Sequence, residues 1–93
     1  MPNEALPTID FSMLVLSLSQ TALVHLGEAA EPDAPEGAPA KRNLPLARQT
    51  IDMLGMLQDK TKGNLTGSEE RLIDQVLYDL RLRFVELSKE EKR

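Results

Sequence analysis

One uncharged segment, Phe11–Leu26, constrains the fold of this chain more than any other part of the sequence. Its apolar residues recur at helical spacing and cover roughly two thirds of the circumference of a helix. A helix that is apolar nearly all round must be buried on several sides, and this 93-residue chain has few other segments to cover it. The chain has no cysteine, which excludes disulfides and thiolate metal sites as supplementary supports. The segment therefore predicts a helical protein whose core is completed by a second copy, as a homo-oligomer, or by a protein partner.

The same segment is too short and too polar to insert into a membrane. Its residues would span about 24 Å as a helix, less than the hydrocarbon core of about 30 Å. The preceding residues 1–10 hold two acids and no base, unlike the start of a signal peptide. The sequence thus predicts a cytoplasmic protein without membrane insertion. Six polar residues would also make the segment costly in lipid: Ser12, Ser17, Ser19, Gln20, Thr21 and His25.

Charge is distributed unevenly along the chain. Residues 1–40 contain six acids and no Lys or Arg, whereas residues 41–93 contain all eleven basic residues and nine acids. The net charge is −4 and the sequence pI is about 4.9. Neither half is basic enough to follow a phosphate backbone, so nucleic acid is not an expected partner.

Three helices are expected, at about 10–27, 44–62 and 67–88, in an all-α domain that spans 10–88. The connection between the last two helices is short, so these helices should form an antiparallel hairpin. The first helix should pack across that hairpin.

The helix starts have recognisable local signals. Thr8 or Asp10 can cap the first helix, and Pro45 suits the first turn of the second. Thr66 followed by Glu69 is a capping box at the start of the third.

Three glycines carry further predictions. Gly27 and Gly63 follow the first and second helices, where a left-handed residue commonly ends a helix. Gly55 lies inside the second helix, where glycine costs about 1 kcal/mol relative to alanine. The expected compensation is close approach of another helix.

The remaining segments lack a helical pattern. Residues 1–9 should form an irregular arm, 28–42 a disordered linker rich in Pro, Ala and acids, and 89–93 a polar tail. The linker could instead be a short recognition peptide, although it has no PxxP motif with flanking aromatic or basic residues.

No constellation for catalysis is visible. The chain has one histidine and no cysteine, and its segment 63–67 lacks the spacing and the lysine of a phosphate-binding loop. His25 has no second histidine with which to hold a metal. We therefore expect no enzymatic activity, no metal and no cofactor.

The candidate sites are surfaces for protein partners. Aromatic and arginine side chains are over-represented in binding hot spots, and they gather near the end of the third helix. Asp79 and Arg83 are expected to form an ion pair along that helix. The candidate partner-binding residues are Phe11, Leu14 and Leu18 in the first helix, and Tyr78, Arg81 and Arg83 in the third.

Three segments resemble a bacterial family of small helical proteins that is classed as a domain of unknown function. They are FSMLVLSLSQTALVHLG, LARQTIDMLGMLQDKTKGNLT and EERLIDQVLYDLRLRF, and the resemblance covers roughly residues 10–86. Phrases such as QTIDxLGML and KTKGNLT are more specific than helical amphipathicity requires. The linker does not take part in the resemblance.

Within the family, the chain is similar to a polarity protein of gliding bacteria. That similarity implies two partners, a RomR-like response regulator and an MglA-like small GTPase of the Ras family. With the response regulator, the chain would act at a cell pole as a guanine-nucleotide exchange factor complex for the GTPase. The alternative is a structural helical homo-oligomerisation or scaffold module with no GTPase link. A third possibility, peripheral membrane binding, is disfavoured because the first helix has no basic residue.

Overall fold

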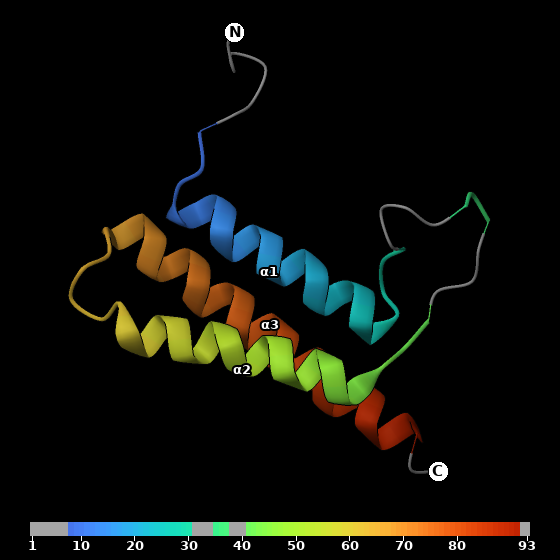
Figure 1. Cartoon of the computed structure of the whole chain (residues 1–93). Helices are drawn as coiled ribbons and strands as arrows, with labels where there is room; N and C mark the ends of the chain where they lie inside the picture. The colour runs from blue at the N-terminus through green and yellow to red at the C-terminus, as the bar shows by residue number, and fades with distance from the viewer. Residues whose placement is uncertain (1–7, 31–34, 38–40, 92–93) are drawn as a thin grey trace, which may run out of the picture.

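The computed structural model describes residues 8–30, 35–37 and 41–91. These residues form three α-helices and no strand, and each helix packs against the other two. Helix α2 runs antiparallel to both α1 and α3, as Figure 1 shows. The predicted all-α fold and the antiparallel hairpin of α2 and α3 are thus confirmed. The helices are α1 (Phe11–Leu26), α2 (Leu44–Lys60) and α3 (Gly67–Glu91).

The helix starts follow the local signals in the sequence. Asp10 rather than Thr8 caps α1, since its Oδ1 accepts a hydrogen bond from the backbone N–H of Met13 at 2.9 Å. The capping box of α3 is complete, because the Thr66 N–H donates to Glu69 Oε1 at 2.8 Å and the Glu69 N–H donates to Thr66 Oγ1 at 3.2 Å. Each of these bonds satisfies a backbone N–H that the first turn of a helix leaves without a partner.

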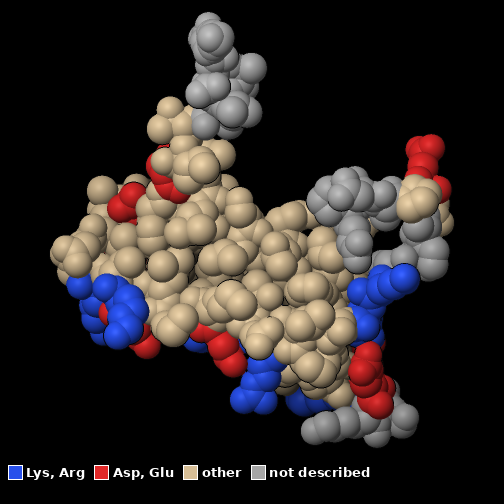
Figure 2. Space-filling view, viewed as in Figure 1, with Lys and Arg blue, Asp and Glu red and all other residues tan. Residues whose placement is uncertain are grey.

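The core lies along the common axis of the three helices, and all three contribute to it. The buried apolar residues of α2 and α3 recur at helical spacing, so each of these helices has one inward-facing side. Charged side chains are unevenly distributed over the surface. Figure 2 shows that charged side chains gather toward the ends and lower edge, whereas the middle of the face over α1 and α2 has none. The buried apolar residues are Val15, Ala22, Leu26, Ala47, Ile51, Leu54, Ile73, Leu77, Leu80 and Leu87.

Helix α1 ends in a regular C-terminal motif. Gly27 has a φ of 79°, and its N–H donates to the carbonyl of Val24 at 3.0 Å. The N–H of Glu28 donates to the carbonyl of Leu23 at 2.9 Å. This pair of bonds is the Schellman arrangement, which requires a left-handed residue at the glycine. The predicted role of Gly27 is therefore confirmed.

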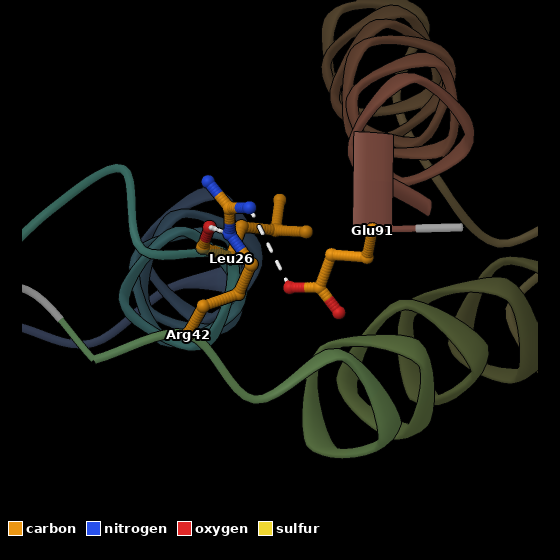
Figure 3. Close-up of polar contacts among 3 residues, drawn as sticks. All are labelled: Leu26, Arg42 and Glu91. Carbon is orange, nitrogen blue, oxygen red and sulfur yellow. Dashed lines mark hydrogen bonds and ion pairs between the residues drawn. The ribbon is translucent and has the colours of Figure 1, made fainter. Parts of the chain in front are cut away.

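The last two carbonyls of α1 are bonded by residues that precede α2. The Asn43 N–H donates to the carbonyl of His25 at 2.7 Å, and Arg42 Nε donates to the carbonyl of Leu26 at 3.0 Å. Arg42 also forms an ion pair with Glu91, at 3.5 Å between Nη1 and Oε2 (Figure 3). Arg42 therefore links the end of α1 to the end of α3.

Two helix ends differ from the sequence prediction. Helix α2 ends at Lys60 instead of 62, because Thr61 leaves the helical conformation and its Oγ1 donates back to the carbonyl of Leu57 at 2.7 Å. Helix α3 extends to Glu91 instead of 88, so residues 89–91 do not belong to a tail. Buried Leu87 and the ion pair of Glu91 hold its last turns. The rest of the predicted arm (1–7), linker (31–34, 38–40) and tail (92–93) lies outside the described residues.

Gly27 and Gly63 allow a matched test of the α1 end, since both are left-handed, with φ of 79° and 86°. A Cβ at Gly27 would meet Arg42 Cβ at 3.3 Å, whereas one at Gly63 would meet nothing within 4 Å. Gly63→Ala should cost about 1 kcal/mol of unfolding free energy, for the left-handed backbone alone. Gly27→Ala should cost about 2 kcal/mol, because hydrogen bonds hold Arg42 in place. Urea denaturation measures the loss of unfolding free energy in both variants. Equal losses would mean that the Arg42 side chain moves away from the new Cβ at no cost in stability.

Candidate protein-binding surfaces

Helix α1 is only partly covered by the α2–α3 hairpin. Its flank toward α3 carries Ser19 and Leu23, which line a groove shared with that helix. Leu14 lies on the opposite flank by helical spacing, and it is exposed. Leu16, nearer the α3 side, is exposed as well. The over-wide apolar surface predicted for this helix therefore leaves leucines facing solvent on both flanks.

Helix α2 has an exposed apolar flank of its own. Gly55 and Gln58 mark the side toward α3, where Gln58 Nε2 donates to Asp74 Oδ1 at 3.4 Å. Helical spacing places Leu46 and Met53 on the other side. Both residues are exposed.

These flanks combine into one surface, which we name the uncharged α1–α2 face and define by Leu14, Leu46 and Met53. Helix α1 contains no Asp, Glu, Lys or Arg, so it adds none of these charged side chains to this face. The charged residues of α2 include Arg48 and Asp52, which pair at 3.9 Å between Nε and Oδ2 on the far flank. Figure 2 shows the resulting uncharged area in the middle of the view. Exposed apolar side chains on an uncharged face make this face a candidate interaction site.

The candidate residues of α1 have different environments. Phe11 and Leu18 are half-buried and pack against the core, so they support the fold. Leu14 alone of the three is available for contact with another molecule.

The candidate residues of α3 lie on two sides of that helix. Tyr78 is exposed on the outer side. Arg81 lies beside α2, and its Nη2 is 2.9 Å from the position that a Cβ on Gly55 would take. The close approach predicted at Gly55 therefore comes from an arginine side chain, and not from the backbone of another helix.

Arg83 has a different partner from the one predicted. Its Nε forms an ion pair with Glu28 Oε1 at 3.1 Å, and Asp79 accepts a hydrogen bond from Gln75 Nε2 at 3.0 Å. Arg83 therefore pairs with Glu28, which follows Gly27 at the end of α1, and not with Asp79 as expected. Both side chains of the observed pair are partly exposed, so its contribution to stability is about 0–1 kcal/mol.

A groove between α1 and α3 has a volume of about 400 Å³. Its polar side chains include Asp79, Arg83 and Glu86, with no histidine among its lining residues. Within the described residues, no three His, Cys, Asp or Glu side chains gather as a metal site would require. None of the described helices combines the length and hydropathy needed to span a bilayer.

Sequence reasoning missed Arg42 and Glu28. Both residues belong to the segment read as a linker, and no local pattern indicates that they contact α3. Their partners are Glu91 and Arg83, which lie far from them in sequence.

A family model described as Domain of unknown function (DUF1844) matches residues 8–86, which include α1, α2 and most of α3. Comparison with curated proteins and with solved structures gave no match.

Proposed function

We propose that this chain, which belongs to the family described as Domain of unknown function (DUF1844), is a non-enzymatic adaptor in bacterial cell polarity and gliding motility. Within that family, the chain resembles RomX, a polarity protein of gliding myxobacteria. By that resemblance the partners are a RomR-like response regulator and an MglA-like small GTPase.

The uncharged α1–α2 face is the observation that supports binding to other proteins. Its exposed residues Leu14, Leu46 and Met53 are apolar, as in the centres of protein interfaces. An adaptor needs such a surface and needs no reactive side chain. The face would bind apolar surface on a protein partner.

Nucleotide exchange can be achieved by binding alone. An exchange factor stabilises the nucleotide-free GTPase more than the nucleotide-bound form, and so shifts the equilibrium toward release. In this proposal the chain acts together with the response regulator, in the cytoplasm and recruited to a cell pole. It uses no metal and no cofactor of its own.

Release of a fluorescent GDP analogue from the GTPase tests the proposal. The chain and the response regulator together should accelerate release, because their binding to the GTPase stabilises its nucleotide-free form. GTP hydrolysis by the chain alone should be undetectable. If the chain binds neither partner in a pull-down, the GTPase role is excluded.

The second candidate is a structural homo-oligomerisation or scaffold module without a GTPase link. Its support is the exposed apolar surface that remains outside the uncharged α1–α2 face, on α3. A chain that self-associates, yet leaves nucleotide release unchanged with both partners present, would favour this alternative.

A further inference from the structure

The outer side of α3 carries an apolar stripe, which we name the outer α3 stripe and define by Tyr78, Leu82 and Val85. These side chains are 65%, 48% and 48% exposed. They follow one another at intervals of four and three residues, so they form one row along the helix. A shallow depression of about 680 Å³ runs along them.

The stripe lies on the side of α3 opposite the core. Leu77 and Leu80, its neighbours in sequence, are buried in the core. Helical spacing therefore places Tyr78 toward solvent, whereas Leu82 lies at the edge of the stripe and also lines the groove between α1 and α3. Arg81 is directed toward Gly55 of α2 and lies at the edge of the stripe. The charged residues that bracket the row are Asp74 before it and Lys89 after it, and both are exposed.

We propose that the outer α3 stripe binds the same stripe of a second copy, with the two α3 helices antiparallel. In an interface with two-fold symmetry, both copies use the same surface. If one residue contacts a second residue of the other copy, the reverse contact also forms. Tyr78 and Val85 are equally far from the midpoint between Arg81 and Leu82. Antiparallel packing about that midpoint therefore places Tyr78 opposite Val85 of the second copy.

The same midpoint also pairs the bracketing charges. Asp74 and Lys89 are equally far from it, on opposite sides. The register set by the apolar row thus places Asp74 of each copy opposite Lys89 of the other, and forms two ion pairs. A parallel arrangement would oppose Asp74 to Asp74 and Lys89 to Lys89, which electrostatic repulsion disfavours. The pairing of Asp74 with Lys89 therefore favours the antiparallel orientation, with another copy of this chain as the occupant.

The row is short, so the dimer should be weak and dependent on concentration. A stable interface buries about 800 Å² on each partner, more than three half-exposed side chains supply. We expect a dissociation constant of roughly tens of micromolar.

Sedimentation equilibrium of the full chain over a wide concentration range tests the dimer. Leu82→Asp should abolish self-association, because it places two charges at the centre of the apolar row. Asp74→Lys and Lys89→Asp should each weaken the dimer about tenfold, since each change turns two attractions into two repulsions. The double variant Asp74→Lys with Lys89→Asp should restore association to nearly the parental level.

Asp79→Lys is the matched control. It changes charge by the same amount on the same helix, but its side chain lines the groove between α1 and α3. It should leave the dimer unchanged. Circular dichroism confirms that each variant is folded, which matters for Asp74 because this side chain accepts a hydrogen bond from Gln58.

Three results would overturn the proposal: a parent chain that stays monomeric throughout, a dimer that tolerates Leu82→Asp, or a charge swap that fails to restore association. A dimer that tolerates the α3 variants and responds to changes in the uncharged α1–α2 face would show that the copies meet elsewhere. Since the assay contains no GTPase and no response regulator, its outcome is independent of the proposed role in nucleotide exchange.

Discussion

Leu54→Ala is expected to lower the unfolding free energy by about 2–5 kcal/mol, which is a large share of the stability of a domain this small. Leu54 is 0% exposed and belongs to the core that all three helices share. Removing most of its side chain leaves a cavity, and the three packed helices can close it only in part. Urea denaturation followed by circular dichroism should show a lower midpoint with an unchanged slope.

The neighbouring residue provides the control. Met53 is 43% exposed on the uncharged α1–α2 face, so Met53→Ala should cost less than about 1 kcal/mol. Equal costs at the two positions would mean that α2 is rotated about its axis relative to the structure.

Leu14→Asp is expected to weaken binding to a protein partner about 100-fold or more while leaving the fold intact. A carboxylate within an apolar interface has to lose its hydration without gaining a partner, and this costs several kcal/mol. Because Leu14 is exposed, the free chain should tolerate the charge. Met53→Asp should have the same effect from α2. Titration calorimetry against a RomR-like response regulator measures the change.

Leu16→Asp is the control that tests whether binding depends on the uncharged α1–α2 face or on another side of α1. It is the same substitution on the same helix, at an exposed position on a different flank. It should leave binding near the parental value. If Leu16→Asp abolishes binding while Leu14→Asp does not, the partner docks on the α3 side of α1 and the assignment of the face is wrong.

Helix positions and most helix ends could be predicted because their causes are local. Asp10, Thr66 and Gly27 act on backbone groups within about one turn of themselves, so their roles follow from short sequence patterns. The inward-facing stripes of α2 and α3 follow from periodicity in the same way.

The candidate site was only partly predictable. Sequence patterns identified Tyr78 and Leu14 as candidates, and both are exposed. They could not separate these residues from Phe11 and Leu18, which share the stripe of Leu14 but pack against the core. Which part of an over-wide apolar helix stays exposed depends on how the other helices cover it. Spacing along one helix does not contain that information.

By itself, the sequence determined three helices, their starts, and the left-handed glycine that ends α1, because each depends on interactions over a few residues. Only the tertiary structure decided the partners of the charged side chains near the chain connections. Arg42 bonds the last carbonyl of α1 and pairs with Glu91, and Arg83 pairs with Glu28 in place of the nearby Asp79. Such contacts join residues that are distant in sequence, and they form only once packing has brought the ends of α1 and α3 together.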